Sequence, residues 1–268
     1  MLSKSKVKML YESGLSERQI GDKLGCSRSP ITRILNKLGL PRRTNAESIS
    51  ALSKSKVETF TPHQEQLVLG SMLGDAGLYW HHFKSNKTER EIHTLRMDFS
   101  HSIKQLEYLM HKCRLLNGGK IQTHTSAFGS IIKKFSLSHT PTLMPYSELC
   151  LDQKGKKLVT MKWVERLNYI GLAYWYVDDG ALIITNGGTC PKLHFYTNSY
   201  RPEERLVLAN KLREFGLDTR EAKTPNHNHD ERILVSRHKP EAVKFMEQIR
   251  PWVVPSMAYK IRYILEGL

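Results

Sequence analysis

Two apolar runs that each end in aspartate constrain this chain more than any other feature. The first, LVLGSMLG, starts at Leu67 and leads into Asp75, and the second, IGLAYWYV, starts at Ile170 and leads into Asp178 and Asp179. An acid at the C-terminal end of a helix is electrostatically unfavourable, because the helix dipole already places negative charge there. Two apolar helices that both end in acids therefore indicate a function rather than ordinary helix-end carboxylates.

The same series of elements is predicted after each run. Apolar and polar residues alternate along residues 92–100, as expected of a strand with one buried face. The first copy is predicted to contain strands at 78–83 and 92–100, a helix at 103–115, and strands at 120–125 and 130–139. The second is predicted to contain strands at 181–184 and 192–199, a helix at 202–215, strands at 218–222 and 231–237, and a helix at 240–249. Each copy is helix, two strands, helix, two strands, helix, which makes the fold class α+β.

The polar faces of these strands are rich in basic and hydrogen-bonding side chains. A sheet with one apolar face and one donor-rich, basic face suits a DNA groove better than bulk water. The strand residues predicted to contact DNA are Arg96, Lys120, Gln122, Lys134, His194, Tyr196 and Asn198.

The chain is basic along its whole length. Its 41 Lys and Arg residues exceed its 26 Asp and Glu residues, which gives a formal net charge of +15. Residues 1–60 carry 12 basic and 5 acidic side chains, residues 61–160 carry 13 and 8, and residues 161–268 carry 16 and 13. The excess is therefore not confined to a basic tail, and it favours a polyanionic partner over a merely solvated basic surface.

The cysteines and the apolar segments indicate the cellular setting. Cys26, Cys113, Cys150 and Cys190 form no CxxC pair, so reduced thiols in an intracellular setting are expected. No apolar run approaches the length of a membrane span, so no membrane partner is predicted. The expected location is the cytoplasm or nucleoid of a prokaryote or phage-infected cell, or an organelle matrix if an organelle encodes the chain.

Residues 17–37 predict two short crossed helices. Gly25 permits the tight turn between them, and Ser27 is suited to cap the second helix. The apolar residues placed where the helices would meet are Ile20, Leu24, Ile31 and Ile34. The pattern resembles a DNA-binding helix-turn-helix, and a purely structural helical hairpin is the alternative. The residues on the outer face of the second helix, predicted to contact DNA, are Arg28, Ser29, Thr32, Arg33 and Lys37.

The chain is predicted to divide into four segments. Between the helix-turn-helix and the first copy, the sequence is polar with few large apolar residues, as is typical of a linker. The predicted segments are the helix-turn-helix domain at 1–43, the linker at 44–60, the first repeated unit at 61–160 and the second at 161–268.

The two motifs and their flanks resemble a known family. LGSMLGDAG and LAYWYVDDG are similar to the paired motifs of the LAGLIDADG homing endonucleases in their single-chain form. The likeness is strongest to the branch typified by the yeast mitochondrial intron-encoded enzyme, and it extends to GKKLVTMKWVERL before the second motif and to PWVVPSMAYKI near the C-terminus. It implies two pseudo-symmetric αββαββα units that form a DNA-binding saddle, with the helix-turn-helix as an addition.

The resemblance implies that the two motif helices pack against each other and that their final acids emerge at the base of the saddle. Asp75 and Asp179 are then the catalytic acids and metal ligands, with Asp178 as second choice because its counterpart in the first copy is Gly74. Carboxylates suit Mg²⁺, a hard ion that takes oxygen ligands, and Mn²⁺ is expected to substitute for it. Gly70 in the first helix aligns with Tyr174 in the second, so bulk on one helix is expected to fill space left by the other.

The resemblance also aligns two basic residues with the family's active-site lysines. These are Lys157 and Lys260, with Lys156 as an alternative register for Lys157. Each lysine is expected to act on the attacking water or on the transition state.

The function implied is a site-specific endonuclease that makes a metal-dependent, staggered double-strand break at a long DNA target, acting as a monomer on double-stranded DNA. The alternative is a non-cutting nucleic-acid binder on the same scaffold, either an intron-splicing maturase with host intron RNA as partner or a repressor-like regulator. Acids in both motifs and a lysine in both flanks favour the enzyme.

Overall fold

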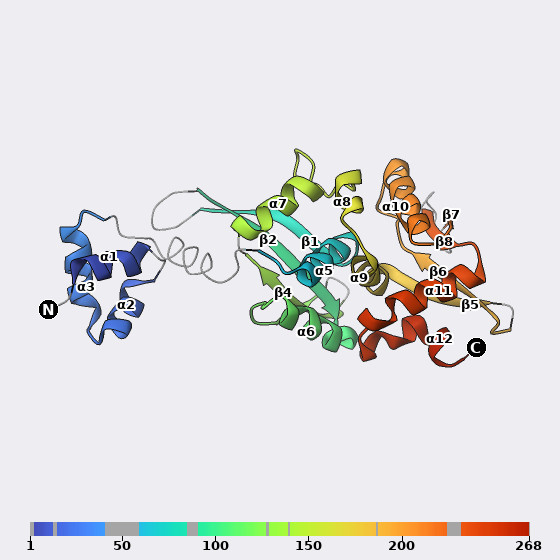
Figure 1. Cartoon of the computed structure of the whole chain (residues 1–268), viewed down its shortest axis with the longest axis horizontal. Helices are drawn as coiled ribbons and strands as arrows, with labels where there is room; N and C mark the ends of the chain where they lie inside the picture. Colours follow the sequence, from blue (N-terminus) through green and yellow to red (C-terminus); the bar gives the residue numbers. More distant parts are fainter. Residues whose placement is uncertain are drawn as a thin grey trace. The chain divides into compact units, whose positions relative to one another are not determined.

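The computed structural model describes residues 3–12, 15–40, 59–84, 91–126, 129–138, 140–185, 187–223 and 232–267. The chain divides into two compact units (Figure 1): a small one of residues 1–60 with 139–142, and a large one of residues 61–138 and 143–268. Nearly all of the predicted linker, residues 44–60, lies outside the described residues. Within the described residues no helix is long and apolar enough to cross a membrane.

The described residues of the small unit form three short helices. They are α1 (Lys4–Glu12), α2 (Glu17–Leu24) and α3 (Arg28–Lys37). Ser16 starts α2 with a reciprocal capping box to Gln19, and Gly25 ends that helix in the left-handed conformation. The core is formed by Val7, Leu10, Tyr11, Ile20, Ile31 and Leu35.

The helical segments and the turn at Gly25 agree with the sequence pattern, with two differences. Ser27 precedes α3 as expected, but its side chain makes no capping hydrogen bond. Leu24 and Ile34 pack on the core but are only partly buried, and Leu35, which the pattern did not include, is fully buried in it. The core position moves by one residue because α1 also packs on α3, so the buried side of α3 faces two helices rather than one.

The large unit contains two copies of one αββαββα arrangement. Its first copy consists of α5 (Pro62–Leu73), β1 (Ala76–Lys84), β2 (Glu91–Ser102), η1 (Ile103–Gln105), α6 (Leu106–Leu115), β3 (Gln122–Thr125), β4 (Ile131–Leu137) and α7 (Thr140–Cys150). Its second copy consists of α9 (Tyr169–Asp179), β5 (Gly180–Thr185), β6 (Cys190–Phe195), α10 (Pro202–Glu214), β7 (Thr219–Lys223), β8 (Arg232–Ser236) and α11 (Lys239–Ile249). The short α8 (Met161–Glu165) precedes the second copy, and η2 (Arg250–Trp252), η3 (Pro255–Ile261) and α12 (Arg262–Leu265) follow it.

The two antiparallel sheets have the same strand order. The first is ordered β1-β2-β4-β3 and the second β5-β6-β8-β7, so the hairpins of each copy combine in the same way. The predicted α+β class and the repeated αββαββα pattern are confirmed. Most strand ends shift from the predicted ranges, and two of the shifts move predicted DNA-contacting residues out of the strands. Lys120 precedes β3, and Tyr196 and Asn198 follow β6, which ends at Phe195. The chain leaves the second sheet there to form the turn before α10.

Helices α5 and α9 lie side by side at the centre of the large unit (Figure 1). Their motif residues are almost completely buried, as expected of helices that are apolar on nearly every face. A side chain at Gly70 would collide with the backbone carbonyl of Gly171 and approach Cβ of Tyr174 to 3.0 Å. The absence of a side chain at Gly70 therefore makes room for Tyr174, as the alignment of the two motifs predicts.

Gly70→Ala is expected to destabilise the large unit by about 1–3 kcal/mol, because the added methyl group overpacks a contact with rigid backbone. Gly119→Ala is the matched control, since a methyl group there meets no atom within 4 Å. Urea unfolding followed by circular dichroism measures both changes. Equal stability of the two variants would contradict close packing of α5 on α9.

Candidate active site

The motif acids lie at the C-terminal ends of the two central helices. Asp75 follows α5 after Gly74, with 36% of its side chain exposed, and Asp179 is the last residue of α9. Burial, followed by repulsion from Asp75 and Asp178, raises the pKa of Asp179 to about 7. The acids are thus close enough to repel one another, and a cation would relieve that repulsion.

The two predicted lysines occupy equivalent places beside these acids. Lys157 Nζ donates to the carbonyl of Ala76 at 3.3 Å, and Lys260 Nζ donates to the carbonyl of Gly180 at 2.8 Å. Ala76 directly follows Asp75, and Gly180 directly follows Asp179. Each lysine is therefore hydrogen-bonded to the residue after one motif acid. Lys157 as a whole residue is exposed and Lys260 is buried, yet desolvation of the ammonium group lowers the pKa of both.

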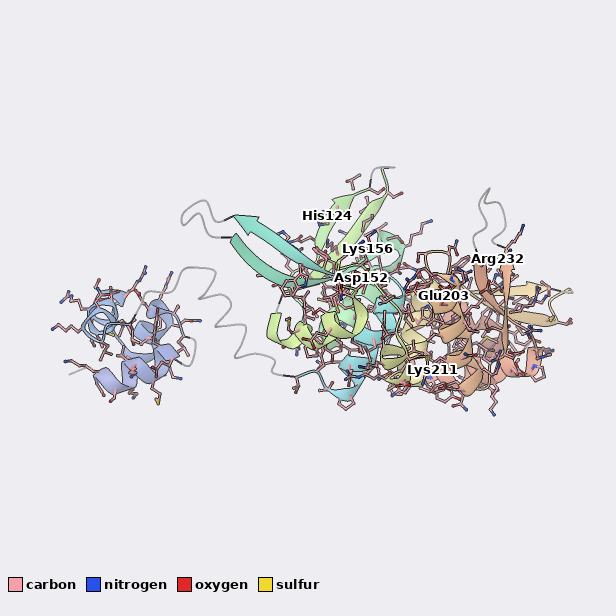
Figure 2. The ribbon with its side chains drawn as sticks, turned by 90° about the horizontal axis from the view of Figure 1, so that it is seen from above. His124, Asp152, Lys156, Glu203, Lys211 and Arg232 are labelled. Carbon is pink, nitrogen blue, oxygen red and sulfur yellow. The ribbon has the colours of Figure 1, made fainter. Side chains whose placement is uncertain are left out.

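Lys260 also closes the end of α9. Its Nζ donates to the carbonyls of Val177 at 2.5 Å and Asp178 at 3.1 Å. Carbonyls in the last turn of a helix have no partner within the helix, and a cation favours that end of the dipole. Lys260 therefore stabilises the helix end that carries Asp179. Lys156, the alternative to Lys157, is exposed in the loop between α7 and α8 (Figure 2).

The carboxylate of Asp178 is hydrogen-bonded within a buried network. Its Oδ1 accepts from Lys112 Nζ at 2.5 Å and from Tyr108 Oη at 2.8 Å, and its Oδ2 accepts from the backbone N–H of Asp75 at 3.4 Å. Gly74 provides the space, because a Cβ there would collide with the Cβ of Asp178. Both oxygens of the second-choice metal ligand are therefore engaged by protein donors.

His101, near the end of β2, lies between Asp75 and Asp178. Its Nδ1 lies 3.2 Å from Oδ2 of Asp75, and its Nε2 lies 4.0 Å from Oδ1 of Asp178. Burial alone would raise the pKa of Asp75, but the hydrogen bond from His101 and the nearby positive charges lower it overall. Among the described residues, the ligand atoms of Asp75, His101 and Asp178 form a cluster able to hold a metal ion, within 4.8 Å of one another.

Sequence reasoning missed His101, Tyr108 and Lys112. The available signal was Lys112, which stands among the apolar residues of the helix expected at 103–115, whereas a solvated lysine is expected on the outward face. Lys112 is instead fully buried, and only the contact of α6 with α9 explains it.

The first sheet presents the predicted polar face. Cross-strand partners share a face, and the register pairs Ser100 with Lys134 and Lys134 with Gln122. Arg96 is on the same face, because Asp98, two residues along β2, pairs with Ser136 of β4. Three of the residues predicted to contact DNA, Arg96, Gln122 and Lys134, therefore line up across three strands.

Asp98 organises the centre of this face. It accepts hydrogen bonds from Arg96 Nε at 2.9 Å and Ser136 Oγ at 2.6 Å, and it also bonds Lys134 and the hydroxyl of Tyr79. Two of the side chains predicted to contact DNA are thus fixed by a carboxylate before any ligand arrives.

The second sheet presents a smaller polar face. His194 pairs with Val235, which pairs with Arg220 on the next strand, so His194 and Arg220 share a face. Tyr196 donates its backbone N–H to the carbonyl of Asp179 at 3.0 Å, which places it next to the second motif acid. In Figure 2, His124 on β3 and Arg232 on β8 lie toward one side of the large unit, and Lys211 on α10 lies toward the other. Strands β3 and β8 therefore lie toward the same side of the large unit in this view.

In the small unit, the predicted DNA-contacting residues separate into two groups. Glu17 Oε2 accepts from Arg28 Nε at 2.8 Å and from Thr32 Oγ1 at 2.8 Å, so those two side chains are held by α2. The remaining three predicted residues are exposed on α3: Ser29, Arg33 and Lys37.

The donor set fits a hard divalent cation. Asp75 and Asp179 supply carboxylate oxygens, the ligands that Mg²⁺ and Mn²⁺ prefer, and no hydrogen bond to the Asp179 carboxylate is formed within the described part of the chain. Burial first, and then repulsion from Asp75 and Asp178, raise the pKa of Asp179, and a bound cation would offset that repulsion.

Paired acid-terminated helices beneath two antiparallel sheets, repeated within one chain, define the fold of the homing endonucleases. The chain belongs to the LAGLIDADG DNA endonuclease family, which it matches over residues 65–239. The resemblance drawn from the motifs is therefore confirmed.

A solved structure and two curated relatives are each similar to most of this chain. The structure of the homing endonuclease I-WcaI bound to its DNA recognition sequence has a TM-score of 0.63 at 22% identity, covering 84% of this chain and 96% of that one. DNA endonuclease I-ChuI of Chlamydomonas applanata is 27% identical over 221 residues, covering 76% of this chain and 96% of the relative. Protein RecA of Mycolicibacterium flavescens is 27% identical over 229 residues, covering 80% of this chain, which spans about half the length (51%) of that relative.

Proposed function

We propose that this chain is a site-specific homing endonuclease that makes a staggered double-strand break in a long DNA target and requires a divalent cation. The observation that carries the proposal is the pairing of each motif acid with a lysine at an equivalent carbonyl, Lys157 at Ala76 and Lys260 at Gly180. Incubating the full chain with a plasmid library and Mg²⁺, and mapping the ends, tests it.

Asp75 and Asp179 would hold Mg²⁺, with Mn²⁺ as a substitute. When bound, such a cation supplies charge neutralisation at the phosphate and makes a nearby water more acidic. The lysines place positive charge where the phosphorane-like transition state develops negative charge, and Lys260 also fixes the helix end that carries Asp179. Water adds to phosphorus, the bond to the 3′ oxygen breaks, and a 5′ phosphate and a 3′ hydroxyl result.

Double-stranded DNA is the proposed partner, and one chain supplies both sites because it carries both motifs. Lys120 and Lys134 suit phosphates, whereas Arg96, Gln122, His194 and Asn198 carry groups that can bond base edges. All four cysteines are free thiols, which supports an intracellular location.

A regulator that binds without cutting is the second candidate. The observation that favours it is the small unit, whose α2–α3 pair and exposed basic residues Arg33 and Lys37 suit a DNA major groove. On either function, the small unit would add a second DNA contact to the large unit's own.

Removal of residues 1–43 is expected to leave a folded large unit that binds DNA more weakly and with a shallower salt dependence. The segment carries 10 basic and 3 acidic residues, and each phosphate that the protein no longer neutralises lowers the slope of log K against log salt by about 0.9. Fluorescence anisotropy at several salt concentrations measures the slope.

Two variants of the full chain refine this test. Arg33→Ala with Lys37→Ala should reproduce part of the loss of affinity, whereas Lys8→Ala, on the exposed side of α1, should not. An unchanged slope after truncation would show that the small unit does not contact DNA.

A further inference from the structure

The registers of the two sheets identify equivalent positions beside the two motif acids. Ala76 pairs with Phe99 in the first copy, and Gly180 pairs with Phe195 in the second. Ala76 and Gly180 each follow a motif acid, so the two phenylalanines are equivalent. Two residues further along stand His101 and Thr197. Both are buried, so each has a fixed set of neighbours.

The two residues contact different groups. His101 Nδ1 faces two acceptors, Oδ2 of Asp75 at 3.2 Å and Oε1 of Gln105 at 3.3 Å, so this nitrogen carries the proton and donates it. Thr197 Oγ1 donates instead to the carbonyl of Arg232 at 3.2 Å. The first motif acid is therefore held by a side chain of its own sheet, whereas no described side chain of the second sheet bonds the carboxylate of Asp179.

The imidazole of His101 packs against the ring of Tyr108. Its ring centroid lies 5.0 Å from that of Tyr108, whose hydroxyl is bonded to Asp178, and Asp178 is anchored by the buried Lys112. Nε2 of His101 is buried and makes no hydrogen bond among the described residues. Packing on Tyr108 and the hydrogen bond from Nδ1 thus hold the ring in the orientation that points Nδ1 at Asp75.

We propose that His101 is a positioning residue for the first active site: it binds Oδ2 of Asp75 and so presents the other carboxylate oxygen to the divalent cation. A partner that orients a ligating side chain typically changes metal affinity or activity 10- to 100-fold when it is removed. The second site lacks this partner, so the two sites should differ in metal affinity and in the rate at which each cuts its strand. This inference rests on the proposed nuclease function.

The test uses the full chain, a duplex carrying the cleavage site with each strand labelled at one end, and two His101 variants. His101→Thr gives the first copy the residue of the second, and His101→Asn keeps an N–H donor near the position of Nδ1. His238→Thr is the matched control, because His238 is exposed and its side chain makes no capping bond at α11.

At limiting Mg²⁺, His101→Thr is expected to slow one strand about 10- to 100-fold, leave the other within about two-fold, and prolong a nicked intermediate. His101→Asn should restore much of the rate, and the control should match the wild type. Calorimetric titration of the protein–DNA complex with Ca²⁺ should show one of two sites weakened by a similar factor in His101→Thr.

Two results would overturn the inference. One is equal slowing of both strands by His101→Thr, and the other is unchanged strand rates and unchanged Ca²⁺ affinities in a folded variant. Failure of the proposed function looks different, because the wild type itself would then cut neither strand.

Discussion

Asp75→Asn and Asp179→Asn are each expected to lower double-strand cleavage by about a thousand-fold or more while DNA binding in Ca²⁺ stays within a few-fold of wild type. The amide keeps the shape of the side chain but removes the charge that holds a divalent cation, whose contribution to the transition state is several kcal/mol. Stability should not fall in Asp179→Asn, because the charge removed is one that Asp75 and Asp178 repel. Strand-specific gels and anisotropy measure cleavage and binding separately.

Asp218→Asn is the matched control. Asp218 lies in the turn between α10 and β7, 30% exposed, and among the described residues its carboxylate pairs with two surface arginines, Arg213 and Arg237. Its variant should cut both strands like the wild type. Near-normal cutting of both strands by either motif variant would remove Asp75 or Asp179 from the active site.

The second large effect is on stability. Lys112→Met is expected to lower the free energy of unfolding by about 3–5 kcal/mol, because it leaves Asp178 buried at the helix contact without its cation. Burial lowers the pKa of Lys112 against the pull of Asp178, so the pair depends on both members being present. Replacing Asp178 as well, in Lys112→Met/Asp178→Asn, should recover most of the stability, since the amide carries no charge, its oxygen can accept from the backbone N–H of Asp75 and its NH₂ group can donate to the hydroxyl oxygen of Tyr108.

The chain offers a matched lysine for this experiment. Lys211 stands four residues before the C-cap of α10, as Lys112 stands four residues before the C-cap of α6. Its partner Glu214 is 60% exposed, so Lys211→Met should cost about 1 kcal/mol or less. Urea unfolding of the four proteins gives the comparison. Equal destabilisation by the two lysine substitutions, or no recovery in the double variant, would contradict a buried ion pair at the centre of the fold.

The fold was accessible from the sequence because its signals are local. The period-2 alternation at residues 92–100 and the two apolar runs come from neighbours in the chain, and they located both copies of the αββαββα unit. Strand ends were less accessible: residues 192–199 were expected as one strand, yet β6 ends at Phe195 because the chain turns to reach α10.

The candidate site was only partly accessible. The motif acids and the flanking lysines stand in recognisable sequence motifs, so their positions could be predicted. The contacts of Lys112 and Tyr108 with Asp178 join residues 66 and 70 positions apart, across two copies of the fold. No local pattern encodes such a pair. In the same way, Glu17 binds Arg28 and Thr32 from a neighbouring helix, which the outer-face pattern of α3 could not show.

The most direct test of the account is a cleavage screen with the full chain. The wild-type protein and Asp75→Asn are incubated with a plasmid library, with Mg²⁺ or with Ca²⁺, and all new DNA ends are mapped on both strands. The account predicts staggered breaks at one long sequence, with 5′ phosphates and 3′ hydroxyls, only for the wild type and only with Mg²⁺. Tight, sequence-specific binding by the wild type without any new ends in Mg²⁺ or Mn²⁺ would contradict it and leave the non-cutting regulator.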